Sequence, residues 1–119
     1  MGLDQFAFAI DNNGEKEELA YWRKHPNLQG WMEDLWASKG CPNAHENSPY
    51  EFNCVPIELT YDDLNALEDA VRDHGLPDTV GFFFGSNSDD RYKEQDLEFI
   101  EKAREALDSG LTVMYDSWW

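Results

Sequence analysis

The stretch "FAFAIDNNGEKEELAYW", residues 6–22, decides how this 119-residue chain begins to fold. Phe6, Phe8 and Ile10 alternate with alanines, which is the period of a half-buried strand. Asn13-Gly14 follows, and Asn-Gly is a strong signal for a type I′ turn, whose two central residues both need a positive φ. We therefore predict an antiparallel hairpin with Asn13-Gly14 at its tip.

That turn also fixes which residues of the two strands face each other. It predicts three cross-strand pairs: Phe6 with Tyr21, Ala7 with Ala20, and Phe8 with Leu19. The pairing gathers the aromatic side chains on one face of the hairpin. We expect that face to be turned towards the core, since a slip by one residue would place these rings in water.

Helical spacing and end signals predict three helices after the hairpin. The first has Pro26 in its first turn and ends at Gly40, and its apolar positions are Leu28, Trp31, Met32 and Leu35. The second begins with a capping box at Thr60 and Asp63 and ends at Gly75, and its apolar positions are Leu64, Leu67, Ala70 and Val71. The third is long and is closed by Gly110, and its apolar positions are Tyr92, Leu97, Ile100, Ala103 and Leu107.

Two further strands complete the expected fold. Val55, Ile57 and Leu59 alternate, and Pro56 favours an edge position or the start of the strand, because proline cannot donate to a ladder. Residues 111–119 alternate again, whereas "VGFFFGS", residues 80–86, reads as a buried strand or an extended segment. Because 119 residues is the size of one domain, we predict a single α+β domain, residues 1–119. A small, mostly antiparallel sheet, made of the N-terminal hairpin, a short middle strand and a C-terminal strand, packs against about three helices.

The chain is strongly acidic, with 9 Lys and Arg against 25 Asp and Glu, a net charge of −16. This charge repels phosphate backbones, so we expect no general nucleic-acid binding. Three interpretations fit the acidic surface: it keeps the protein soluble, it attracts a basic partner, or it mimics the surface of DNA. Since no apolar run approaches about 18 residues and residues 1–20 do not read as a secretory signal, we expect no membrane association and a cytoplasmic protein, in the host cytoplasm if phage-encoded. Cys41 and Cys54 are then expected to be thiols.

The candidate ligand site is the cluster Tyr21, Trp22, Arg23, Lys24 and His25, the only place where Arg and Lys are adjacent. An arginine fork beside a flat indole suits an anion such as a phosphate. Tyr115 is expected nearby on a neighbouring strand. In the alternative interpretation the aromatic rings lie in the core and the cations are solvated or paired with Glu17 or Glu18.

Other residue groups give weaker indications. Cys41, His45 and Cys54 are ligand types that zinc accepts, but three ligands do not complete a structural site, so we expect no metal and no cofactor. Asp62-Asp63, Asp89-Asp90 and Asp96 could bind a divalent cation, but the spacing of a calcium loop is absent, so we expect these carboxylates to lie on solvated faces, the first pair in the first turn of a helix. Trp118 and Trp119 end the chain as a candidate partner interface, because one of two successive strand residues must face away from the other.

Several short motifs keep a fixed order along the chain: "MGLD", "AYWRK", "GFFFGS", "DLEFIEKAREAL" and a closing "YDSW". Together they cover nearly the whole sequence and resemble an uncharacterised family of small phage and bacterial proteins. The resemblance implies shared polar positions at Tyr21, Arg23, Lys24, Ser86, Asp96, Tyr115 and Ser117. The chain departs from that family at His25-Pro26 and in residues 40–53.

These observations favour a non-enzymatic accessory domain that binds a macromolecular partner, either another protein or a second copy of itself. No catalytic motif with a nucleophile is present. One alternative is a small-molecule or anion-binding domain, or an enzyme, that uses Tyr21, Arg23, Lys24 and His25. Another is a DNA-mimicking inhibitor of a host enzyme, which needs carboxylates spaced along one face like phosphates.

Overall fold

The computed structural model describes residues 3–44, 46, 52, 55–73, 76 and 89–118. In chain order the elements are β1 (Asp4–Ile10), β2 (Lys16–Arg23), α1 (Pro26–Ser38), β3 (Ile57–Leu59), α2 (Tyr61–Arg72), α3 (Asp89–Asp108) and β4 (Thr112–Trp118). The four strands form an antiparallel sheet in the order β2-β1-β4-β3. The predicted α+β class is confirmed.

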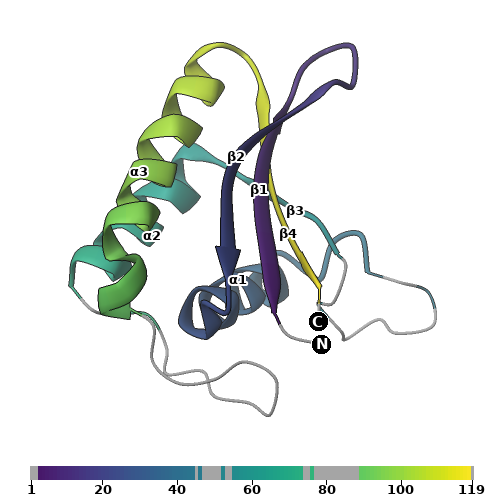
Figure 1. The fold of residues 1–119 in the computed structure, drawn as a ribbon. Coiled ribbons are helices and arrows are strands. Elements are labelled where there is room, and N and C mark those ends of the chain that lie inside the picture. Colours follow the sequence, from purple (N-terminus) through teal and green to yellow (C-terminus); the bar gives the residue numbers. More distant parts are fainter. Residues whose placement is uncertain are drawn as a thin grey trace.

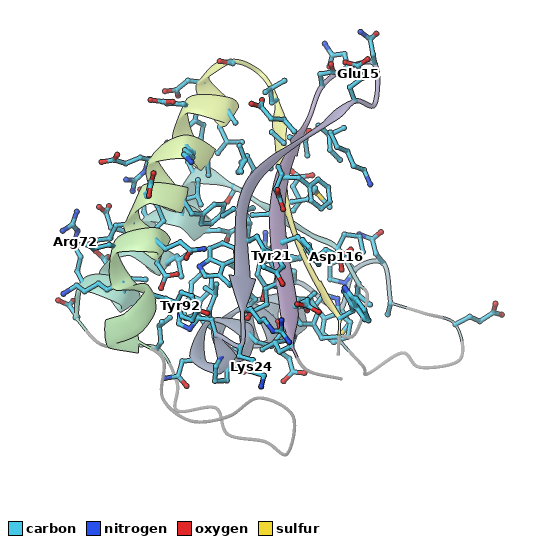
Figure 2. The ribbon with its side chains drawn as sticks, in the orientation of Figure 1. Glu15, Tyr21, Lys24, Arg72, Tyr92 and Asp116 are labelled. Carbon is cyan, nitrogen blue, oxygen red and sulfur yellow. The ribbon has the colours of Figure 1, made fainter. Side chains whose placement is uncertain are left out.

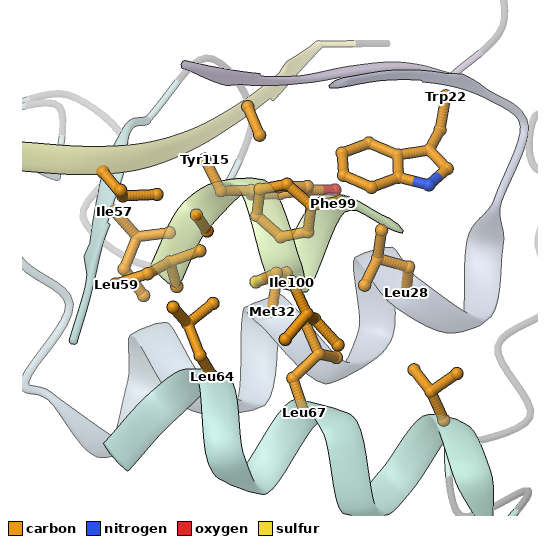
Figure 3. Packing of buried hydrophobic residues seen from close by; sticks show 14 of the residues in the cluster. Trp22, Leu28, Met32, Ile57, Leu59, Leu64, Leu67, Phe99, Ile100 and Tyr115 are labelled. Atoms are coloured by element: carbon orange, nitrogen blue, oxygen red, sulfur yellow. The ribbon is translucent and has the colours of Figure 1, made fainter. Parts of the chain in front are cut away.

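The three helices lie on one side of the sheet (Figure 1). Side chains from the sheet and from all three helices meet between these two layers, as Figure 3 shows for Trp22, Tyr115, Met32, Leu64 and Phe99. All five are buried. Because β1 and β4 are the central strands, the N-terminal and C-terminal segments of the described chain are hydrogen-bonded side by side at the middle of the molecule.

The hairpin forms, but its turn differs from the predicted type I′ turn. Gly14 N–H donates to the carbonyl of Asp11 at 3.0 Å, so the central residues are Asn12 and Asn13, and only Gly14 has a positive φ, of 83°. The Asp11 carboxylate accepts from the backbone N–H of Asn13 and of Glu15, at 2.8 and 2.9 Å. This side chain stabilises a turn that needs left-handed backbone at one residue instead of two.

The register agrees with two of the three predicted pairs. Phe6 pairs with Tyr21 and Ala7 with Ala20, but Phe8 pairs with Glu18. A β-bulge between the Ala7 and Phe8 pairs takes up Leu19 as an extra residue. The predicted pairing of Phe8 with Leu19 is therefore wrong, because the bulge moves the rest of β2 by one position.

The prediction that the phenylalanines face the core is also wrong. Gln5, Ala7 and Ala9 are the buried residues of β1, whereas Phe6 and Phe8 are partly exposed on the opposite face. The helices cover the alanine side, and the bulk on that side comes from neighbouring strands, for example Trp22 and Tyr115. We call the uncovered apolar residues of the sheet the open face; they are Phe6, Phe8, Ile10, Tyr21, Met114 and Trp118.

The helix ends follow the predicted signals. Thr60 and Asp63 form a capping box at the start of α2, and α1 begins at Pro26. Gly40 and Gly110 follow α1 and α3 with positive φ, of 87° and 83°. The predicted end of α2 at Gly75, and the segment 80–86, lie outside the described residues.

Packing between helices agrees with the predicted stripes in most positions. Leu28, Met32, Leu64, Leu67 and Val71 are buried. Trp31, Leu35 and Ala70 are only partly buried. Arg104 of α3 donates to Glu68 of α2 at 2.8 Å, and hydrogen bonds from Arg104 and then Arg72 lower the pKa of the Glu68 carboxyl. None of the helices in the described ranges is both long and apolar enough to cross a membrane.

Candidate functional site

A cluster of polar side chains is buried where the sheet lies against α1 and α3. Its members are Gln5, Trp22, His25, Gln29, Asp96, Tyr115 and Ser117. They come from β1, β2, the residue before α1, α1 itself, α3 and β4. We call this set the buried polar cluster.

Asp96 joins α3 to the end of β2 and the start of α1. Its Oδ2 lies 2.8 Å from His25 Nε2, and its Oδ1 accepts from the indole Nε1 of Trp22 at 2.8 Å. The exposed fractions of the His25 and Asp96 side chains are 0% and 1%. A carboxylate removed from water needs such donors, since an uncompensated buried charge is strongly destabilising.

Gln5 and Tyr115 extend the cluster across the sheet. The Gln5 amide accepts from His25 N at 2.8 Å and donates to His25 O at 3.0 Å, so it holds the backbone of the β2–α1 junction. It also donates to the Tyr115 hydroxyl at 2.9 Å, which in turn donates to Gln29 Oε1 at 2.6 Å. Burial raises the pKa of Tyr115, so this hydroxyl stays protonated and can donate throughout the neutral range.

Two atoms of the cluster have no hydrogen-bond partner in the described structure, Gln29 Nε2 and Ser117 Oγ. Both belong to side chains that are almost fully buried. Buried polar atoms without a partner are few in native proteins. The other amide atom of Gln29, Oε1, accepts from the Tyr115 hydroxyl, so only Nε2 of that side chain is left without a partner.

Tyr92 and Gln95 of α3 contact the outer edge of β2. The Tyr92 ring stacks on His25, with centroids 4.8 Å apart, and its hydroxyl donates to the carbonyl of Arg23. Gln95 donates to the carbonyl of Tyr21. Figure 2 shows Tyr92 between α3 and the end of β2. These contacts cover the C-terminal half of an edge strand.

The structure divides the predicted ligand residues into two groups. Tyr21, Arg23 and Lys24 are exposed, whereas Trp22 and His25 are buried on the other side of the strand. Tyr115 and Ser117 are buried with the second group, and Ser86 lies outside the described residues. Alternation along β2 separates Trp22 from Tyr21 and Arg23, because successive side chains of a strand point to opposite faces. Lys24 and His25 follow the end of β2, where the positive φ of Lys24 breaks the alternation.

The exposed group contains its own contacts. Tyr21 donates to Asp4 Oδ1 at 2.6 Å, and this hydrogen bond raises the pKa of Tyr21. Lys24 has a φ of 59°, which places it in the left-handed region where the chain turns from β2 towards α1. Figure 2 shows Lys24 at that end of the strand.

The remaining predicted site residues are placed only in part. Cys41 is a partly buried free thiol, while His45 and Cys54 lie outside the described residues. Within the described ranges, no three His, Cys, Asp or Glu side chains gather as a metal site would require. Trp118 is 54% exposed on the open face, and Trp119 is not among the described residues.

The expectation that Asp96 lies on a solvated face is wrong, because its side chain is buried against Trp22 and His25. The residues that sequence reasoning missed are Gln5 and Asp96 as partners of His25. One signal for Asp96 was present, because it occupies the helical row between Tyr92 and Ile100, where the spacing calls for an apolar residue. An acid in that row indicates a buried partner. For Gln5 the signal was weaker, since it alternates with Ala7 and Ala9, which were assigned to the wrong face.

The buried polar cluster can fix elements in place, but it offers no surface to a substrate. His25 and Asp96 are closed off from solvent, so a proton on this pair has no direct route to a bound molecule. Their geometry links β2, α1 and α3. Among the described residues, surfaces open to a partner include the open face and the outer edge of the N-terminal half of β2.

Comparison of the chain with protein-family models, with curated proteins and with solved structures finds no match in any of the three. The resemblance to small phage and bacterial proteins stays a prediction.

Proposed function

We propose that this chain is a protein-interaction domain that binds a basic partner through its open face. The observation that carries the proposal is the arrangement of the sheet. The three described helices lie on one face (Figure 1), and apolar side chains on the other face are partly or fully exposed. Tyr21 and Trp118 are 43% and 54% exposed there. Antiparallel sheets that face water usually present polar residues on that side.

The apolar residues of the open face adjoin one another. Phe6 and Tyr21 are cross-strand partners with ring centroids 5.2 Å apart, and Phe8 pairs with Met114 on the other side. Contiguous apolar patches on soluble proteins mark interaction sites more often than isolated apolar residues do. Exposed Tyr, Trp, Phe and Met side chains are also the types enriched in interfaces.

Charge around the open face favours a basic partner. The register places Asp4, Glu18, Glu58 and Asp116 on the same side of the sheet as these apolar residues, with Lys16 and Arg23 as the cations of β2. One cation of the chain already contacts this face: Lys16 Nζ lies 4.9 Å from the centre of the Phe8 ring, in a cation–π contact. A net charge of −16 also attracts basic proteins and opposes close approach of a second copy.

The buried position of His25 supports this function over an anion-binding site. Of the cluster proposed from sequence, only Tyr21, Arg23 and Lys24 reach solvent. Tyr21 is hydrogen-bonded to an aspartate, which opposes binding of an anion at that hydroxyl.

The test compares two substitutions in an affinity capture from the source organism's lysate, followed by titration of the captured protein after purification. Trp118→Thr removes an exposed aromatic ring from the open face, and Tyr61→Thr removes one of similar exposure from α2. We expect Trp118→Thr to raise the dissociation constant at least about tenfold over that of the wild-type protein. Tyr61→Thr should leave it within about twofold of the wild-type value.

Three outcomes contradict the proposal. The first is a partner whose affinity is indifferent to Trp118→Thr. The second is the capture of no protein above background. The third is sedimentation of the purified chain as a dimer that Trp118→Thr dissociates, because the occupant of the open face would then be a second copy.

A further inference from the structure

The outer edge of β2 differs between its two halves. β2 lies at the edge of the sheet, so one side of its backbone has no neighbouring strand among the described residues. In the C-terminal half, the carbonyls of Tyr21 and Arg23 accept hydrogen bonds from Gln95 and Tyr92 of α3. Over residues 16–19, no described side chain bonds to the backbone on that side. Unpaired edge backbone is a template for another strand.

The register identifies which groups point outwards there. Lys24 N–H donates to Leu3 O, which establishes that the odd-numbered residues of β1 direct their hydrogen bonds to β2. After the bulge, Ala9 pairs with Glu17. The alternation of an antiparallel ladder therefore turns the N–H and C=O groups of Lys16 and Glu18 away from β1. Because of the bulge, the outward-facing residues are even-numbered in this half of β2, whereas the carbonyls that bond to α3 belong to the odd-numbered Tyr21 and Arg23.

A hollow of about 360 Å³ lies beside this free backbone, between β2 and the last turns of α3. Leu19, Ala106 and Leu111 supply apolar lining, and Glu17, Glu18 and Glu105 supply carboxylates. A second hollow of about 200 Å³ shares Glu17 and Leu111 with the first and continues towards the hairpin tip. Asp11 and Glu15 line it, and Figure 2 shows Glu15 at that tip.

We propose that residues 16–19 of β2 accept an extended basic segment of a partner as a fifth strand of the sheet. Main-chain hydrogen bonds to Lys16 and Glu18 would hold the segment, as in other complexes that add a strand to an exposed sheet edge. Every second side chain of the bound segment would point into the hollow and contact Leu19 and Leu111. This edge borders the open face at Lys16 and Glu18, but it uses their backbone groups and the hollows on the helix side, so the inference does not depend on the function proposed above.

Charge determines the chemistry of the occupant. The two hollows are lined by five carboxylates, Asp11, Glu15, Glu17, Glu18 and Glu105, against the two lysines Lys16 and Lys102. A segment that alternates Lys or Arg with aliphatic residues matches both the carboxylates and the apolar lining. A fully apolar segment matches only the apolar lining, and an acidic segment is repelled by the carboxylates.

The first experiment uses a synthetic peptide of about six residues, the length of a typical strand, that alternates lysine and valine. Its binding to the wild-type protein is followed by amide chemical shifts. We expect shift changes at residues 16–19 and 105–111, and at least about tenfold weaker binding of the same peptide methylated on alternate backbone nitrogens. A glutamate–valine peptide is expected not to bind.

A pair of substitutions tests the backbone contribution from the side of the protein. Glu18→Pro and Glu18→Ala both remove the carboxylate, but only proline also removes the outward N–H. We expect Glu18→Pro to bind the lysine–valine peptide at least about tenfold more weakly than Glu18→Ala does. If Glu18→Pro does not fold, the methylated peptide on wild-type protein decides the question.

Three results overturn the inference: equal binding of the methylated and unmethylated peptides, shift changes confined to the open face, or no binding of the lysine–valine peptide at millimolar concentration.

Discussion

Asp96 lies in a row of α3 that is otherwise turned towards the core, between Tyr92 and Ile100. Its two oxygens contact separate donors, Trp22 Nε1 and His25 Nε2. A buried acid of this kind adds little net stability over an apolar residue of similar volume, but losing one partner leaves the other unpaired. Asp96 therefore specifies which surfaces of β2 and α3 come together more than it adds to the strength of their contact.

Asp96→Asn tests this arrangement. The amide offers one acceptor and one donor where the carboxylate offers two acceptors, so either Trp22 or His25 faces an N–H group. We expect the free energy of unfolding to fall by about 3 kcal/mol, the range found when a buried charged pair is broken. Urea denaturation followed by tryptophan fluorescence measures it.

Glu101→Gln is the matched control, because Glu101 is exposed on the same helix. It removes one carboxylate from α3 without touching the core, and we expect a change within about 0.5 kcal/mol. Equal effects of the two substitutions would show that Asp96 is not buried against these donors.

At the scale of the elements, the helix ends could be predicted from sequence, but the side of β1 that faces the core could not. The capping box of α2 and the glycines after α1 and α3 follow from local hydrogen bonding and from φ, so a sequence pattern is sufficient to predict them. The hairpin was predicted as an element, but its core side was assigned to Phe6 and Phe8 when it belongs to Ala7 and Ala9. On that face the space over the small side chains of β1 is filled by large side chains of the neighbouring strands, such as Tyr115 of β4, the cross-strand partner of Ala7.

Ala7→Leu tests which face of β1 is covered. Ala7 is fully buried, so three added heavy atoms overpack the layer between β1 and the helices. We expect a loss of about 1 to 3 kcal/mol in the free energy of unfolding. Chemical denaturation measures the change.

The comparison is Phe8→Leu, made on the partly exposed side of the same strand. It is expected to lose less than about 1 kcal/mol, since solvent replaces part of the ring's contacts. If Phe8→Leu were the more destabilising of the two, the phenylalanine side would be the core face.

Charge acts on the molecule as a whole. Sixteen uncompensated negative charges lie on a chain of 119 residues, and they repel one another in the folded state. Salt screens this repulsion, since the Debye length falls from about 30 Å at 10 mM to about 8 Å at 150 mM ionic strength. The same field favours a basic partner, whether at the open face or at the edge of β2.

We expect the thermal unfolding midpoint to rise by about 4 °C between 10 mM and 150 mM sodium chloride, equivalent to roughly 1 kcal/mol. Calorimetry measures the midpoint. Glu101→Lys lowers the net negative charge by two and should show a smaller rise. A midpoint that falls with added salt would mean that attractive ion pairs outweigh the general repulsion.

The candidate site could be predicted only in part. Tyr21, Arg23 and Lys24 do reach the surface, but the period of a strand places Trp22 on the opposite side, and His25 follows it into the core. Adjacency in sequence was therefore a poor guide to adjacency in space. His25 and Trp22 meet Asp96 across 71 and 74 positions of chain, a distance at which no local pattern applies.

The sequence by itself determined the hairpin, the capped start of α2, the glycines after α1 and α3 and the α+β class, because these depend on interactions between residues close along the chain. Only the tertiary structure decided the strand order, the bulge at Leu19, the covered side of the sheet and the buried polar cluster. The physical reason is that apolar alternation requires one face of a strand to be buried, but the helices that pack against the sheet select which face it is.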